Sequence, residues 1–152
     1  MLDDALTGFL EEGLAIHLGT RNEQLEPNGA RVCAVKVDDD REHVVAYLPR
    51  AAAAIVLADL RANGQVALAF ARPVDDRACQ VKGVFVSERR ATQRERPLVM
   101  AQWQGFVRQL AAIGIPAEAT RNWTTWPSVA VRIRVTALFN QTPGPNAGAP
   151  LS

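Results

Sequence analysis

The residues best suited to chemistry lie in the stretch from Gln65 to Ser87, where a polar turn joins two alternating apolar segments. Gln80 and Lys82 share one face of the second segment, and Arg77 stands just before it. Such donors can hold a planar anionic ligand, and Gly83 lets a ligand approach the backbone closely. An ordinary amphipathic hairpin with a solvated edge is the competing interpretation.

Metal and thiol chemistry have little support in the sequence. His17 has no second histidine or carboxylate at metal-binding spacing, and His43 lies at a predicted loop edge, so both are expected to be structural. The three adjacent aspartates at 38–40 lack the alternating pattern of a calcium loop and indicate a hairpin turn. Cys33 and Cys79 sit in apolar strand patterns without CxxC spacing, which predicts reduced core thiols.

Length and composition describe an ordinary globular chain. The 152 residues suit one domain, and 48% apolar residues with a net charge of +1 give no large single-sign field. Nucleic-acid and membrane-surface roles are therefore unsupported. No apolar run is long enough to span a membrane, and the first residues are acidic where a signal peptide is basic, so the sequence predicts a cytoplasmic protein.

Hydrophobic periodicity predicts about three helices and six strands. The helices are expected between Asp3 and Gly13, over 51–63 and over 97–113; the strands over 14–19, 31–37, 43–48, 66–71, 79–86 and 128–139. Residues 25–30 and 89–96 are expected to be loops. Without a βαβ repeat, this pattern indicates an α+β fold built on an antiparallel sheet or barrel.

The chain is expected to form one domain over 1–140, followed by a Pro/Gly-rich tail over 141–152. Such a tail is normally disordered, although the stiff segment QTPGP can also form an extended strap across a partner subunit. GxGxxG, P-loop, nucleophile-elbow and HExxH motifs are missing from the sequence. Residue chemistry alone therefore leads to a barrel with a cationic groove.

The segments RVCAVKV, VVAYLPR, LADLRANGQVALAFARPVDDRACQVKG and LFNQTPGP, in this order, resemble the pyridoxamine 5′-phosphate oxidase-like, FMN-binding split-barrel superfamily, especially its short members. The resemblance covers nearly the whole chain. It implies a six-stranded antiparallel split β-barrel, a homodimer, and flavin mononucleotide held where the two subunits meet. Haem or a deazaflavin is an alternative occupant in this superfamily.

The resemblance also nominates cofactor-binding residues. Arg31 and Lys36 match the two ends of the family's Arg-x-x-x-x-Lys strand, and Arg77 matches the Arg of its Arg-Gln-Val element. The Gln of that element falls on Ala78, so Gln80, two residues later on the same face, is expected to substitute for it. Lys82 completes the expected cationic groove.

Two departures from the family pattern affect the expected activity. Alanines at 51–54 replace the family's Ser-Arg-Lys phosphate element, which leaves only Arg50 nearby. The long C-terminal Trp/Arg segment of true pyridoxamine phosphate oxidases has no counterpart, so vitamin B6 oxidation is not expected. The resemblance implies an FMN-binding flavoprotein, as an oxidoreductase acting on a small molecule that the sequence does not identify, or alternatively a non-enzymatic dimer carrying flavin or haem.

Overall fold

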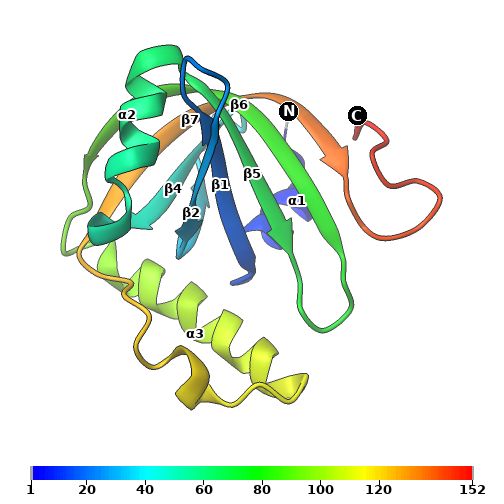
Figure 1. The fold of residues 1–152 in the computed structure, drawn as a ribbon. Coiled ribbons are helices and arrows are strands. Elements are labelled where there is room, and N and C mark those ends of the chain that lie inside the picture. The colour runs from blue at the N-terminus through cyan, green and yellow to red at the C-terminus, as the bar shows by residue number, and fades with distance from the viewer. Residues whose placement is uncertain (1, 152) are drawn as a thin grey trace.

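A computed structural model describes residues 2–151 and shows a strongly curled antiparallel sheet with three α-helices (Figure 1). The strands are β1 (Ala15–Arg21), β2 (Pro27–Val32), β3 (Ala34–Val37), β4 (His43–Pro49), β5 (Gln65–Ala71), β6 (Ala78–Arg90) and β7 (Ser128–Asn140). The helices are α1 (Asp4–Leu10), α2 (Ala54–Asn63) and α3 (Arg96–Ala112), with short 3₁₀ turns η1 (Arg50–Ala52) and η2 (Ala117–Thr120). The sheet order is β2-β1-β5-β6-β7-β4-β3, with all neighbours antiparallel. The predicted α+β class is confirmed.

The structure has seven strands where the sequence predicted six, because the predicted strand at 31–37 is longer and interrupted at Cys33. Its first part, β2, pairs with β1, and its second part, β3, pairs with β4. One continuous stretch thus lies at both ends of the strand order, which curls the sheet into a nearly closed barrel. The prediction of a loop over 25–30 was wrong for residues 27–30: Pro27 occupies the first position of an edge strand, where proline is tolerated.

The barrel interior is filled by alternate residues of the strands. Ile16 and Leu18 of β1 and Leu68 and Phe70 of β5 point into it and are almost fully buried. Helices α1 and α2 add apolar side chains, including Phe9, to the same cluster. The strand alternation seen in the sequence therefore separates an apolar inner face from an outer face that carries the remaining side chains.

Helix α3 covers part of the outer face and forms a second apolar cluster there. Trp103 and Phe106 of this helix pack over Cys33 and Tyr47. The side chain of Gln102 accepts a hydrogen bond from the Val35 N–H at 2.9 Å and donates one to the Val35 carbonyl at 2.7 Å. These two bonds satisfy the backbone N–H and carbonyl of Val35 on the edge of β3, just after the chain has left its pairing with β1.

The first turn of α3 is held by an ionic network. Glu95 accepts hydrogen bonds from the Tyr47 hydroxyl at 2.8 Å, from the Arg89 guanidinium and from Thr92. Residues 89–96 were predicted to be a solvated loop, and the structure differs from that prediction at both ends of the segment. Strand β6 continues to Arg90, and the Glu95 side chain is hydrogen-bonded to Tyr47 of the sheet. Arg89, near the end of the long strand β6, supplies the positive charge that pairs with Glu95 and stabilises the packing of α3 on the sheet.

The C-terminal segment folds back on the sheet. Leu151 N–H donates to the Leu138 carbonyl at 2.9 Å, and Asn140 N–H donates to the Ala149 carbonyl at 2.9 Å. Pro150 forms an isolated bridge with Phe139. The described part of the tail therefore extends the free edge of β7 within the same chain instead of leaving the domain as an extended strap; its predicted contact with a partner subunit stays a prediction. No described helix is both long and apolar enough to cross a membrane.

Candidate functional site

The outer face of β2, β1, β5, β6 and the end of β7 is not covered by α3 (Figure 1). Half of the paired residues on this face are glycine or alanine. Strand register aligns its residues in two rows. The first row runs Gly29, Gly19, Ala67, Lys82 and Ala137; the second runs Arg31, His17, Ala69, Gln80 and Phe139. We call these ten residues the open face. Its glycine and alanine floor, with cations at both sides, suits a flat ligand.

Arg31 occupies the corner of the open face nearest to α3. Its guanidinium carbon lies 4.2 Å from the centroid of the Trp123 ring and 5.6 Å from that of Phe106. Within residues 2–151 its side chain makes no hydrogen bond or ion pair. Burial lowers the pKa of the guanidinium below its ordinary value, against an opposing effect of Cys33. The aromatic rings thus hold a cation whose donors are available to an anion.

His17 lies beside Arg31 on the adjacent strand, and the two residues are direct cross-strand partners. Partial burial lowers the pKa of the imidazole, and the neighbouring Arg31 charge lowers it further. A neutral imidazole offers one donor and one acceptor nitrogen, and neither is taken by another described side chain. The structure therefore places a titratable group on the open face, where the sequence predicted a structural histidine.

The other side of the open face contains Lys82 and Gln80. The Lys82 ammonium lies 4.9 Å from the centroid of the Phe139 ring, and the side chain has no acidic partner among the described residues. A shallow hollow of about 320 Å³ lies against Lys82 and includes Gly19, Ala67 and Ala137. Arg21 and Gln65 line its far end. Lys82 and Arg21 are the cations that line this hollow, and Arg31 lies outside it, in the second row of the open face.

The other predicted cofactor-binding residues lie elsewhere. Lys36 is exposed on the outside of β3, but α3 crosses the chain between Arg31 and Lys36, where Gln102 binds Val35. Arg50 begins η1, and its backbone N–H donates to the Pro127 carbonyl near the start of β7. Arg77 stands in the β5–β6 turn with its guanidinium 4.4 Å from the Phe9 ring centroid. The structure thus brings Arg31, Gln80 and Lys82 to one face and separates them from these three.

Sequence reasoning missed His17 and Trp123 as residues of this site. A signal for His17 is the small outer face shared by β1 and β5: once these strands pair, His17 is the one polar side chain among glycine and alanine. Trp123 belongs to the loop before β7, and it packs against Trp103 with ring centroids 5.8 Å apart. Periodicity carries no information on where such a loop folds, so its contact with Arg31 required the structure.

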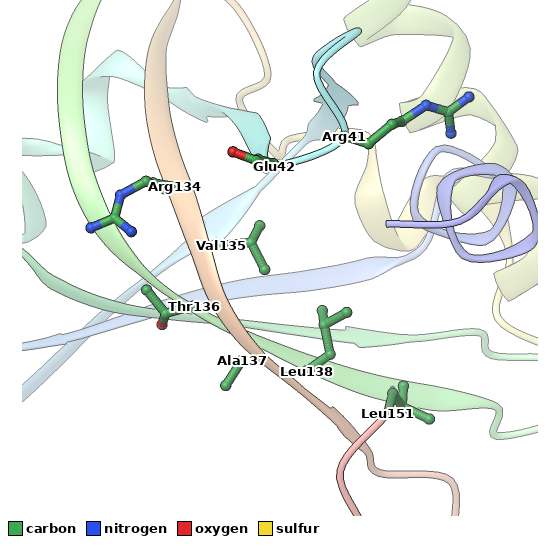
Figure 2. A pocket seen from close by; sticks show the side chains of 8 residues that line it. All are labelled: Arg41, Glu42, Arg134, Val135, Thr136, Ala137, Leu138 and Leu151. Carbon is green, nitrogen blue, oxygen red and sulfur yellow. The ribbon is translucent and has the colours of Figure 1, made fainter. Parts of the chain in front are cut away.

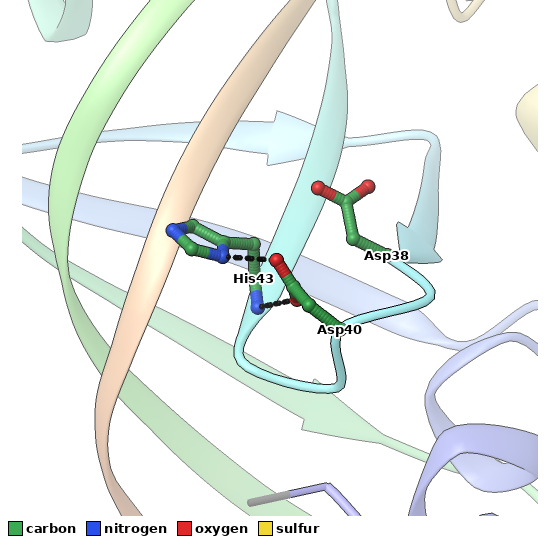
Figure 3. Close-up of side chains that lie close together, drawn as sticks. All are labelled: Asp38, Asp40 and His43. Atoms are coloured by element: carbon green, nitrogen blue, oxygen red, sulfur yellow. Dashed lines mark hydrogen bonds and ion pairs between the residues drawn. The ribbon is translucent and has the colours of Figure 1, made fainter.

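Asp38 and Asp40 of the β3–β4 turn are engaged in ion pairs, and Figure 3 shows the contact between Asp40 and His43. His43 Nδ1 lies 2.7 Å from Asp40, and Arg132 contacts Asp38 at 2.7 Å and Asp40 at 3.3 Å. Asp38, Asp40 and His43 lie close enough together to share a cation. Arg132 already supplies positive charge to both carboxylates, so the cluster is best explained as a braced turn.

A second hollow, of about 400 Å³, lies along β7 and is bordered by the C-terminal Leu151 (Figure 2). Val135 and Leu138 line its apolar side, and Arg134 stands at its rim. Arg41, also at the rim, is bound to Asp4 and Thr7. Arg134 is the one cation among its lining residues without a partner in the described chain, and Glu42 adds a carboxylate to the lining, so this hollow suits an anion less well than the open face does.

Both cysteines are inert in this fold. Burial raises the pKa of the Cys33 thiol and of the Cys79 thiol to about 12. Each thiol is therefore protonated at neutral pH and is a poor nucleophile and metal ligand. The two residues lie in different apolar clusters, one on each side of the sheet, which agrees with their prediction as reduced core thiols.

Comparisons with known proteins identify the fold. No protein-family model and no curated protein sequence matches the chain. Solved structures do: an F420 reductase superposes with a TM-score of 0.58 at 18% identity, covering 86% of this chain and 93% of the other. An FMN-binding protein from Syntrophomonas wolfei gives 0.55 at 11% identity over 96% and 83%. A proposed pyridoxamine 5′-phosphate oxidase from Lactobacillus delbrueckii gives 0.57 at 14% identity over 91% and 93%.

The fold is a pyridoxamine 5′-phosphate oxidase-like split barrel. The strand division at Cys33 is consistent with such a barrel, because β2 and β3 each pair with a different half of the sheet. At identities of 11–18% the superpositions establish the fold of this split barrel and not its ligand.

Proposed function

We propose that this split barrel binds flavin mononucleotide on its open face and uses it in an oxidoreductase reaction. The observation that carries the proposal is the pair of cations Arg31 and Lys82 on either side of a glycine and alanine floor, both without acidic partners among residues 2–151. A flavin is planar and carries an anionic phosphate, and these features match the floor and its cations. The FMN-binding and F420 reductase neighbours share the fold and support the choice of ligand class.

The open face suits the isoalloxazine ring of a flavin, whereas the residues at the family's phosphate-binding position do not suit a phosphate group. Gly19 leaves open space above the floor, since a Cβ there would meet only the Ala67 carbonyl at 3.9 Å. Alanines at 51–54 stand in place of the family's phosphate element, and none of them carries a side-chain donor. A bound phosphate would therefore depend on Arg31 or Lys82, because a buried dianion needs several charge-assisted donors.

The chain's contribution to the reaction would be binding and orientation. A bound flavin supplies electron and hydride transfer. Gln80 can donate or accept a hydrogen bond at the edge of the flavin ring, and Arg31 can stabilise negative charge on the flavin. Trp123 can limit the access of solvent to the flavin from the side of α3. The residues of the open face do not select a particular small-molecule substrate.

We further propose that the protein is a homodimer whose second subunit covers the open face. Glycine and alanine residues of β2, β1, β5 and β7 let another surface approach the open face closely, and Arg31 and Lys82 become better ligand donors when water is excluded. Static light scattering should then give twice the 16.5 kDa mass of the chain. A mass of 16.5 kDa at micromolar protein would reject the dimer.

A non-enzymatic carrier of flavin or haem is the second candidate. The exposed Ala51 and Ala52 favour it, because a missing phosphate element is expected when tight cofactor retention has been lost. A carrier would bind and release flavin without reducing it, whereas an oxidoreductase would show flavin reduction by a reduced nicotinamide or by substrate.

Titration of the purified protein with FMN tests the proposal. Flavin absorbance bands should shift, and flavin fluorescence should fall, because the ring leaves water and approaches Trp123. Saturation should occur at micromolar FMN with about one flavin per chain. Unchanged absorbance and fluorescence at that concentration would reject flavin binding, and a Soret band on addition of haem in its place would favour the haem carrier.

A further inference from the structure

The neighbouring residues Arg31 and His17 combine a permanent cation with a group that can become one. They are direct cross-strand partners on the outer face of β2 and β1. Neither side chain has a hydrogen bond or ion pair within the described chain, and no carboxylate is placed against either. Trp123 and Phe106 hold the guanidinium from one side, so its remaining donors face the open face.

We propose that Arg31 and His17 form a proton-linked anion site, in which binding of a phosphate-like or carboxylate group protonates His17. The chemical class is an oxyanion with at least two acceptor oxygens, one for the guanidinium and one for the imidazolium. Such a group could belong to the flavin phosphate or to an anionic substrate. The inference rests on the proposed function for the open face but identifies a residue and a proton that this function does not require.

The direction of the pH dependence follows from the surroundings of His17. Arg31 on β2 is the charged group that acts on it; the facing residue of β5 is Ala69, and its neighbours on β1 are Ala15 and Gly19. In the free protein, burial and the Arg31 charge lower the pKa of the imidazole. A bound oxyanion beside it raises that pKa, so binding takes up a proton and becomes stronger as the pH falls.

Sulfate is the first probe, because its own charge is constant across the pH range of histidine. Sulfate affinity of the wild-type protein should rise as the pH falls, by up to about tenfold per unit between about pH 8 and pH 5. Calorimetry in two buffers of different ionisation enthalpy should show proton uptake on binding. His17→Gln keeps a polar side chain and should remove both the pH dependence and the proton uptake, whereas His43→Gln, the matched control at the Asp40 pair, should retain them.

FMN and riboflavin then distinguish the source of the anion. If the flavin phosphate occupies the site, His17→Gln should change the pH dependence of FMN binding beyond the phosphate's own titration near about pH 6, and it should leave the pH dependence of riboflavin binding unchanged. If His17→Gln removes the pH dependence of sulfate binding but leaves that of FMN binding unchanged, the site takes a substrate anion. Sulfate binding that is absent or pH-independent, or that is unaffected by His17→Gln, would overturn the inference even if FMN binds. Proton-linked sulfate binding without FMN binding would leave the inference standing and reject the flavin.

Discussion

The guanidinium of Arg31 lies 4.2 Å from the centre of the Trp123 ring, although 92 residues separate the two in sequence. This contact joins the loop before β7 to the strand β2 and fixes one corner of the open face. An arginine held against an aromatic ring loses less freedom on binding an anion than a mobile one does. The loop is therefore part of the site as well as a cover for α3.

Replacing Trp123 by leucine should weaken FMN binding by about 0.5–2 kcal/mol, because Arg31 loses the cation–π contact that orients it. Isothermal titration calorimetry measures the loss. The matched variant Trp126→Leu removes the ring near Arg96, at the other end of the loop, and should bind FMN normally. Equal losses in both variants would indicate a general effect on the loop and not a role for the Arg31 contact.

Gln102 is expected to be more important for stability than its polar side chain suggests. Gln102→Ala leaves the Val35 N–H and carbonyl without their partners, at about 1–3 kcal/mol for each buried group left unsatisfied. Urea denaturation should show the lower free energy of unfolding. Gln104→Ala, on the exposed side of the same helix, should change it by less than about 0.5 kcal/mol. Similar small effects in both variants would mean that β3 does not need this side chain.

Acid should weaken the docking of α3 through Glu95. Hydrogen bonds from Arg89 are the main cause that holds the pKa of this carboxyl well below its ordinary value, and bonds from Thr92 and Tyr47 act in the same direction. A lowered folded-state pKa stabilises the protein above the unfolded-state value and ceases to do so as the pH falls towards the folded-state value. The free energy of unfolding of wild type should exceed that of Glu95→Gln above about pH 5, and the difference should shrink below about pH 4.

Chemical denaturation at several pH values checks this dependence. Glu23→Gln, in an exposed turn and without a side-chain hydrogen bond among the described residues, is the control and should show no pH-dependent difference. A Glu95→Gln difference that stays constant down to about pH 3 would show that Arg89 and Glu95 are not coupled in solution.

The fold was largely predictable from the sequence because strand alternation is a local property. Val66, Leu68 and Phe70 alternate with alanines, and this pattern fixed both the strand and the face that it buries. The interruption at Cys33 was not predictable, because each side of it is an acceptable strand and the break is defined by pairing with β1 and β4. Pro27 and Gly29 indicated a loop, and long-range pairing overrode that local preference.

The site was predictable in part for the same reason. Gln80 and Lys82 share a strand, so their common face followed from alternation alone. The grouping of Arg31 with them required the order of the sheet, and the separation of Lys36 required the path of α3. Arg77 was expected beside Gln80 because it is near in sequence, but the β5–β6 turn directs it to Phe9 of α1.

FMN affinity measured across matched charge variants tests most directly whether the ligand lies on the open face. Arg31→Ala and Lys82→Ala should each weaken binding by about 1.5–3 kcal/mol, the range for a charge-assisted hydrogen bond. Arg50→Ala and Arg77→Ala remove the same charge at distant positions and should bind FMN as wild type does, and Lys36→Ala should lose less than Arg31→Ala. Unchanged affinity in Arg31→Ala and Lys82→Ala, with a loss in Arg50→Ala or Arg77→Ala, would contradict the account.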